Sequence, residues 1–210
     1  MYLFTRRRRL ADGNGTAGVE WARSIAAKVT DLTGHDIRLW ATVYSAGYGT
    51  ISWTGWFDDL EAIETLGDTL AADAAMEKLT NAGTRYSAGG LDDSLIKLIH
   101  GAPPGGPVQY VAKVVAMASP GSIERAVASG TEIAKTAESI TGVPVLFGRS
   151  MTGPYLQVNW FTPYESITAM EKADAALAAD PSWIELLDST KDLFLADTGT
   201  PAATIYRRLS

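Results

Sequence analysis

An internal repeat constrains the fold of this chain more than any single residue does. One segment, WFDDLEAIETLGDTLAAD, begins at Trp56, and a second, WFTPYESITAMEKADAALAAD, begins at Trp160. Both open with Trp-Phe and close with Leu-Ala-Ala-Asp, and each follows a helix-like stretch that ends in Thr-Gly, at Gly34 and Gly142. Such self-similarity indicates a duplicated structural unit.

The spacing between repeated residues is not constant when the two Trp-Phe pairs are aligned. Gly34 and Gly142 are 108 positions apart, Trp56 and Trp160 are 104 apart, and Asp73 and Asp180 are 107 apart. This alignment predicts a longer turn before the third strand in the first half and a longer helix in the second half.

Each half predicts the same order of elements, β-α-β-β-α-β. β-Branched and aromatic residues alternate with polar residues between Gly and Pro turns, which is typical of strands. The expected strands cover 2–9, 37–44, 50–57 and 94–100 in the first half, and 109–117, 145–151, 155–161 and 204–209 in the second.

Capping residues mark the expected helix ends. Gly34 and Gly142 lie where a left-handed C-terminal cap is needed. The expected N-terminal caps are Ser119, with Pro120 at the first helical position, the capping boxes Asp58–Glu61 and Thr162–Glu165, the latter with Pro163 at the first helical position, and Asp180 followed by Pro181.

These elements predict an α+β fold with two tandem ferredoxin-like βαββαβ repeats. A four-stranded sheet with helices on one face leaves its other face bare, so the two sheets are expected to pack as an intrachain α/β barrel. We place the first repeat at 1–101, a linker rich in Pro and Gly at 102–107, and the second repeat at 108–210.

The order of elements, the repeat, and a short motif together resemble the dimeric α+β barrel superfamily. The motif comprises Phe161, Tyr164-Glu165-Ser166 and the stretch from Ala179 to Trp183, and it is similar to one in antibiotic-biosynthesis-monooxygenase-like and NIPSNAP-like members. The resemblance implies that the chain holds small apolar or aromatic molecules. Some members oxidise polyketides or quinol-like compounds without a cofactor, some bind or degrade haem, some isomerise lactones, and some have no known activity. Fold alone does not choose among these activities.

Composition excludes several classes of function. The net charge is −6 and cysteine is absent, which argues against nucleic-acid partners, disulfides, thiolate catalysis and cysteine-ligated metals. Two histidines, His35 and His100, are too few for an expected metal or haem site, so we expect no metal and no cofactor. No apolar run reaches the length of a membrane span, and no signal peptide is expected, so we expect no membrane partner and a cytoplasmic location.

The stretch from Gly13 to Gly18 matches the G-x-G-x-x-G pattern of dinucleotide-binding loops. The strand before it carries four arginines, and Asp36 precedes the next apolar run, whereas a dinucleotide site needs an acidic residue after that strand. We therefore interpret this stretch as a turn entering a helix.

The arginine run at 6–9 allows two interpretations. In a strand, Arg6 and Arg8 point to one side and could bind a carboxylate or phosphate of a ligand. Alternatively, the strand ends near Arg6, and the rest is a solvated loop paired with Asp12, Asp92 or Asp93. The first strand of the second half is apolar at the equivalent place.

Aromatic and amide side chains on the hairpin strands are the remaining candidates. Asn159, Gln157 and Tyr44 are the candidate catalytic residues, because amides and a phenol can polarise a phenolate or enolate. The other candidate ligand-binding residues are Arg38, Trp40, Trp53 and Tyr155, together with Arg6 and Arg8. The alternative is that the aromatic residues only fill the space between the sheets.

These residues predict a small-molecule-binding protein, with two possibilities left open. One is a cofactor-independent oxygenase or isomerase that acts on an apolar or aromatic compound. The other is a non-catalytic ligand-binding or assembly protein. The expected state is a monomer with pseudo-twofold symmetry or a homodimer. Function is expected where the two halves differ, in one specialised pocket.

Overall fold

The computed structural model describes residues 1–195 and 202–210. The first half contains strands β1 (Tyr2–Leu10), β2 (Arg38–Val43), β3 (Thr50–Phe57) and β4 (Ser87–His100), helices α1 (Gly15–Thr33), α2 (Leu60–Ala72) and α3 (Ala74–Ala82), and a short 3-10 helix, η1 (Gly83–Tyr86). The second half contains strands β5 (Tyr110–Met117), β6 (Leu146–Ser150), β7 (Gln157–Tyr164) and β8 (Ala202–Arg208), and helices α4 (Ile123–Thr141), α5 (Ile167–Ala179) and α6 (Pro181–Ser189).

The strands follow the order β1-β3-β2-β8-β5-β7-β6-β4 in a closed barrel. Each repeat contributes its strands in the ferredoxin-like order, fourth-first-third-second, as β4-β1-β3-β2 and β8-β5-β7-β6. The predicted fold class is therefore confirmed.

The chain divides into two compact units. The first unit comprises Met1–Leu95 and Arg207–Ser210, and the second comprises Ile96–Tyr206. The domain boundaries expected from the sequence, 1–101, 102–107 and 108–210, stay a prediction. The expected linker carries no helix or strand.

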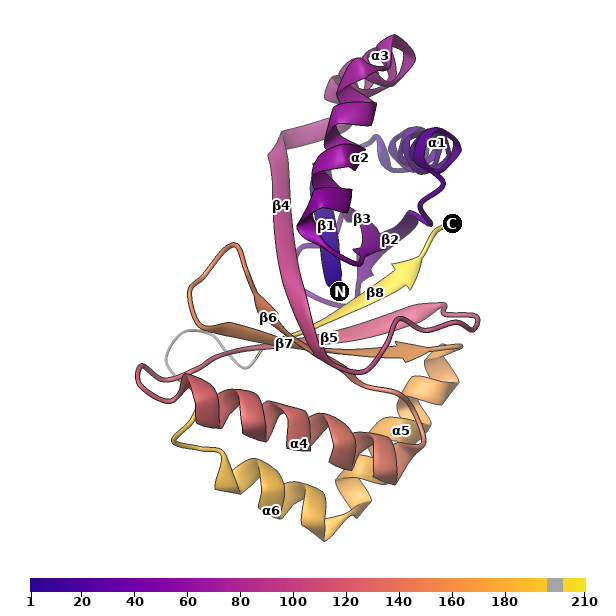
Figure 1. Cartoon of the computed structure of the whole chain (residues 1–210). Helices are drawn as coiled ribbons and strands as arrows, with labels where there is room; N and C mark the ends of the chain where they lie inside the picture. The colour runs from indigo at the N-terminus through magenta and orange to yellow at the C-terminus, as the bar shows by residue number, and fades with distance from the viewer. Residues whose placement is uncertain (196–201) are drawn as a thin grey trace. The chain divides into compact units, whose positions relative to one another are not determined.

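In the first unit, α1, α2 and α3 cover one face of the sheet (Figure 1). Strand β3 pairs antiparallel with both β1 and β2, so that Arg6, Trp53 and Leu39 lie in one cross-strand row. Leu39 and Ile51 pack against the apolar stripe of α1, which includes Ala22 and Ile25. This helix-facing side of the sheet is the apolar core of the unit.

In the second unit, α4, α5 and α6 lie on one face of β5, β6 and β7 (Figure 1). Val158 and Trp160 on β7 pack with Phe147 on β6 and with Ile133 of α4. Leu186 of α6 packs against the same cluster. Val158 and Trp160 therefore share the core face of β7.

The structure corrects the alignment of the two halves. Strand β3 and β7, α2 and α5, and α3 and α6 all start and end 107 residues apart, and α1 and α4 are 108 apart. Trp53 and Trp160 are the equivalent residues, because each donates its indole N–H to equivalent helix carbonyls, those of Ala22 at 2.9 Å and Gly130 at 2.8 Å. The alignment of Trp56 with Trp160, and the length differences inferred from it, were wrong.

Several helix caps also differ from the prediction. The side chain of Asp59, not Asp58, accepts from the N–H of Ala62, and Ser166, not Thr162, accepts from the N–H of Ala169. Pro163 lies within β7, where it faces Val111 in register. Helix α4 begins at Ile123, so the expected cap at Ser119-Pro120 was also wrong.

Other predicted helix ends are confirmed. Gly34 and Gly142 have left-handed conformations, with φ of 72° and 69°. Asp180 accepts from the N–H of Ser182, and Pro181 is the first residue of α6. Asp73 caps α3 in the same way, accepting from the N–H of Met76 at 2.6 Å.

Replacing Gly67 with alanine is expected to raise the free energy of unfolding by about 0.5–1 kcal/mol. Gly67 lies inside α2, its φ is not in the left-handed region, and a Cβ built there meets no atom within 4 Å. Alanine therefore lowers the entropy of the unfolded chain without a clash. Urea unfolding measures the change, and a destabilised G67A would show that the space around α2 is closed.

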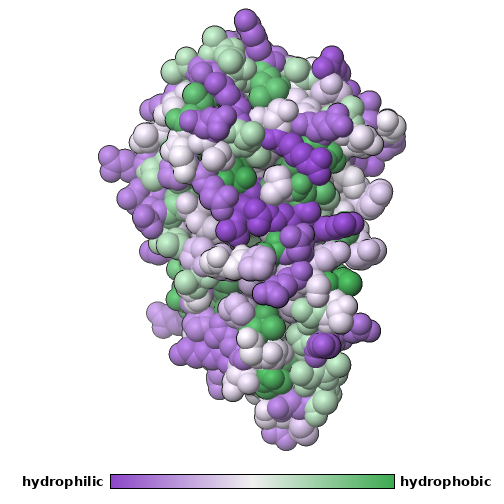
Figure 2. Space-filling model, turned by 90° about the vertical axis from the view of Figure 1, so that its right-hand side faces the viewer, coloured by the Kyte–Doolittle hydropathy of each residue, from purple (hydrophilic) through white to green (hydrophobic). Residues whose placement is uncertain are grey.

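The view in Figure 2 shows hydrophilic and hydrophobic residues interspersed over that face. Large exposed apolar side chains, such as Leu60, Leu91 and Ile184, come from separate elements. None of the helices in the described part of the chain is both long and apolar enough to cross a membrane.

Candidate functional site

A cavity of about 300 Å³ lies between the sheet and the helices of the first unit. This volume is at the lower end of the range for small-molecule pockets. We call it the first-unit cavity. Its wall is mostly apolar and includes Phe4, Trp21, Trp53, Leu66, Leu70 and Met76.

The period of two along a strand brings three side chains of β1 to this cavity. Phe4, Arg6 and Arg8 alternate with residues on the other face, and all three line the cavity. Gly55 pairs with Phe4 across β3. A Cβ on Gly55 would lie 2.8 Å from the Phe57 ring and 2.9 Å from Ile37 Cδ1, so only glycine fits there without displacing a neighbour.

Two tryptophans are fixed in the cavity wall by their indole N–H groups. Trp21 donates to the carbonyl of Leu79 at 2.8 Å, and Trp53 donates to the carbonyl of Ala22 at 2.9 Å. Their rings meet edge to face, with centroids 5.5 Å apart. Because both N–H groups are already bonded, the indoles offer a ligand their carbon surfaces rather than a hydrogen-bond donor.

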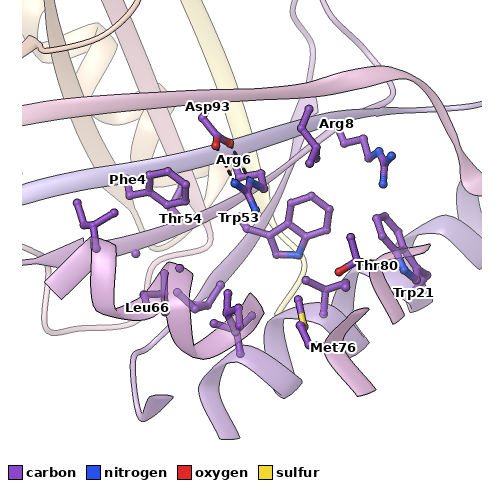
Figure 3. Close-up of a pocket in the computed structure, with 18 residues that line it drawn as sticks. Phe4, Arg6, Arg8, Trp21, Trp53, Thr54, Leu66, Met76, Thr80 and Asp93 are labelled. Carbon is purple, nitrogen blue, oxygen red and sulfur yellow. Dashed lines mark hydrogen bonds and ion pairs between the residues drawn. The ribbon is translucent and has the colours of Figure 1, made fainter. Parts of the chain in front are cut away.

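Arg6 is neutralised by Asp93 at the β4 side of the cavity. Its Nε donates to Oδ1 at 2.8 Å and its Nη2 to Oδ2 at 2.7 Å, which is the two-pronged geometry of a strong arginine–carboxylate pair. Figure 3 shows the pair above Trp53. The hydrogen bonds that Arg6 donates to Asp93 raise the pKa of Arg6 above its ordinary value, against the opposing effect of burial. Arg6 is therefore a paired cation.

Arg8 has no such partner. Its guanidinium stands over the ring of Trp21, with Cζ 5.5 Å from the ring centroid. Its Nε is buried, and no group in residues 1–195 and 202–210 accepts a hydrogen bond from it. Figure 3 shows Arg8 next to Trp21, apart from the Arg6–Asp93 pair. The cavity therefore combines an apolar wall with one unpaired cation.

The second unit carries different side chains at the equivalent places. At the offset of 108, Val114 and Ala116 replace Arg6 and Arg8, and both belong to its apolar core. The rings of Phe147 and Phe194 pack against Trp160, with centroids 5.1 and 5.8 Å away. The two repeats thus differ at the strand that carries the arginines.

The arginine strand follows neither sequence interpretation completely. Strand β1 runs through Arg9 to Leu10, so a strand ending near Arg6 was wrong. The expected ion pairs are nevertheless present, since Arg6 pairs with Asp93, and Arg7 pairs with Asp92 at 2.7 Å. Arg8 has no ion-pair partner among the described residues, and its role in binding a ligand stays a prediction.

The predicted site residues divide between the two faces of the first sheet. Arg6, Arg8 and Trp53 come together in the first-unit cavity. Trp40 lies on the opposite face, opposite Ser52 in register, and donates its indole N–H to Thr54 Oγ1 at 2.9 Å. Arg38 lies on that face too, with Nε bonded to Asp36 at 2.8 Å.

The two candidate tyrosines are exposed and lie outside the strands. Tyr44 follows β2 with 77% of its surface exposed and a φ of 51°. Tyr155 precedes β7 and is 86% exposed. Neither lines the first-unit cavity. A ligand-binding or catalytic role for them stays a prediction.

The candidate amides form a closed hydrogen-bond network in the second unit. Gln157 Nε2 donates to Ser150 Oγ at 3.1 Å and to Asn159 Oδ1 at 3.0 Å, and Asn159 Nδ2 donates to Ser150 Oγ at 3.0 Å. Asn159 is fully buried. The amides on this face of β7 thus bond to each other and to Ser150 on β6, and their catalytic role stays a prediction.

The sequence analysis missed Trp21, Met76 and Asp93 as cavity residues. Trp21 could have been found by extending the helical spacing of Ile25 and Val29 back one turn. Met76 could have been found only after helix α3 was predicted. Asp73 and Asp180 hold equivalent positions in the two halves, and each caps the helix that follows it, so the pair could have predicted α3.

Metal and dinucleotide sites are not supported by the described residues. Within residues 1–195 and 202–210, no group of three or more His, Cys, Asp or Glu side chains is placed to hold a metal ion. Gly18 packs against Leu10, where a Cβ would lie 2.6 Å from Cδ2, and Gly13 has a positive φ of 80°, so these two glycines are accounted for by helix–strand packing and by the turn.

The sequence matches no protein-family profile and no curated protein. Its fold, however, matches solved structures over the whole chain. The structure of a "putative monooxygenase" from Fusobacterium nucleatum aligns with a TM-score of 0.71 and 12% identity, covering 100% of this chain and 92% of that one. An "anthrone oxidase-like protein" aligns with a TM-score of 0.65 and 13% identity, covering 100% and 91%. A "putative chlorite dismutase" aligns with a TM-score of 0.58 and 10% identity, covering 100% and 96%. The chain therefore has the fold of the dimeric α+β barrel superfamily, as the sequence resemblance predicted.

Proposed function

We propose that this protein binds a small apolar or aromatic molecule in the first-unit cavity. The observation that carries the proposal is an open space of about 300 Å³ with apolar walls inside one repeat. Protein interiors are normally close-packed, with few voids larger than a water molecule. In the second repeat Phe147, Trp160 and Phe194 pack together in an apolar cluster. An open apolar space within the first repeat favours a ligand.

The shape of the wall favours an aromatic ligand. Phe4 and the edge-to-face pair of Trp21 and Trp53 present ring surfaces, and Met76 adds a polarisable, adaptable thioether side chain. Solved structures with this fold include one named anthrone oxidase-like and one named a putative monooxygenase. Those names agree with an aromatic ligand, and the likeness itself is one of fold.

The binding proposal is tested by filling the cavity with a larger side chain. Replacing Leu70 with tryptophan places an indole in the cavity wall and is expected to weaken binding of a neutral aromatic probe, naphthol, at least about tenfold. Isothermal titration calorimetry at several temperatures measures the affinity and the negative heat-capacity change expected for apolar burial.

Leu60→Trp is the matched control for this variant. Leu60 lies on the same helix, is 47% exposed and does not line the cavity. The L60W variant should therefore bind naphthol with the same affinity as the original chain. Equal affinities for all three proteins would place the probe elsewhere and reject this cavity as the site. No binding of naphthol or of related aromatic probes by the original chain would reject the binding function.

We propose further that the protein acts on the bound molecule as a cofactor-independent oxygenase or isomerase. Anthrone is a suitable oxygenase probe, because one O2 converts it to anthraquinone and one water with no further reductant. Dissolved-oxygen measurements with an excess of anthrone should show consumption above the uncatalysed rate, and L70W should abolish the excess. Binding without excess consumption would reject the oxygenase and leave the isomerase and the non-catalytic ligand-binding protein.

A further inference from the structure

The arginine run leaves one cation unbalanced at the first-unit cavity. Arg6 shares the cavity wall with Asp93, which neutralises it, and Arg7 pairs with Asp92. Arg8 lines the same cavity and has no carboxylate at salt-bridge distance among the described residues. Arg6, Arg8 and Asp93 together leave a net charge of one positive unit on a wall that is otherwise uncharged and mostly apolar.

The surroundings of Arg8 reinforce this positive charge. Tyr86 packs against Trp21, with ring centroids 6.2 Å apart, and Arg85 stands over Tyr86 at 4.6 Å. Arg85 also has no carboxylate partner in the part of the chain that the structure describes. Burying a cation is costly unless a hydrogen-bonded anion accompanies it. Arg8 lines the apolar cavity, and its buried Nε has no hydrogen-bond partner among the described residues.

We propose that the ligand is an apolar or aromatic carboxylate whose anionic group binds Arg8. This inference rests on the proposed binding function and names its ligand class. The planar guanidinium offers parallel N–H donors that match a carboxylate, while its face stays on Trp21. The apolar body of the ligand extends along β1 towards Phe4, four residues away, which is about 13 Å in a strand.

The test compares a naphthalene carboxylate with its uncharged carboxamide, which has nearly the same shape. The original chain is expected to bind the carboxylate about 10–100-fold more tightly, as a hydrogen-bonded charge pair requires. Arg8→Gln should abolish this preference, so that the ratio of the two affinities falls to about one, and Arg8→Lys should restore part of it. Isothermal titration calorimetry gives each affinity.

Arg9→Gln is the matched control for total charge. Arg9 is the next residue of the same strand, is exposed and does not line the cavity, so R9Q should keep the full preference for the carboxylate. If the original chain binds acid and amide equally, the carboxylate proposal is overturned while the binding function stands. If neither compound binds, the carboxylate proposal and the binding function are both rejected. Should R8Q fail to fold, as circular dichroism would show, the comparison of acid and amide in the original chain decides the proposal.

Discussion

Replacing Trp160 with alanine is expected to lower the free energy of unfolding by about 3–5 kcal/mol. Trp160 is 7% exposed and packs between the rings of Phe147 and Phe194. Its indole N–H donates to the carbonyl of Gly130 at 2.8 Å, which ties β7 to α4. Alanine removes the contacts of the indole with both phenylalanine rings and leaves a cavity that the surrounding helices and strands fill only in part. Urea denaturation followed by circular dichroism measures the loss.

Two control variants separate the causes of this loss. Trp160→Phe keeps an aromatic ring but removes the N–H donor, so it should cost clearly less than alanine. Trp56→Ala should also cost less, because Trp56 is only half-buried. Equal losses for W56A and W160A would favour the Trp-Phe alignment of the sequence over the constant offset seen in the structure.

The sequence was sufficient to predict the fold because its evidence was distributed over many residues. The doubled order of strands and helices depended on alternation, helical spacing and the glycine caps Gly34 and Gly142, and an error at one position left the rest intact. The alignment failed because it used one conspicuous pair. Trp56 and Trp160 lie in corresponding strands but on opposite faces of their sheets, whereas Trp53 makes the bond equivalent to that of Trp160.

The site was predicted only in part, for a different physical reason. Alternation along β1 correctly grouped Arg6 with Arg8. Which of these two arginines has a carboxylate partner depends on Asp93, which lies far along the chain on β4 and bonds to Arg6 but not to Arg8. The cavity exists because the side chains around it do not fill the space between the sheet and the helices. This can be seen only once the helices and strands are packed together.

Replacing Gly130 with alanine is expected to lower the free energy of unfolding by about 1–3 kcal/mol. Gly130 is the eighth residue of α4, as Gly67 is of α2, and alanine at an unobstructed helical position is stabilising. At Gly130, however, a Cβ would lie 2.5 Å from Phe147 Cε2 and closer still to Cζ, and Phe147 is fully buried. The ring can retreat only by disturbing its packing against Trp160.

The opposite signs expected for G67A and G130A make the pair diagnostic. Helix propensity contributes the same stabilising amount to both, so the difference between them measures the overpacking at Phe147. Phe147→Leu in the G130A background should recover part of the stability, because leucine frees the space that the new methyl group needs. Stabilisation of the chain by G130A alone would show that α4 can move away from β6, and the close contact between this helix and Phe147 would then not hold the second unit together.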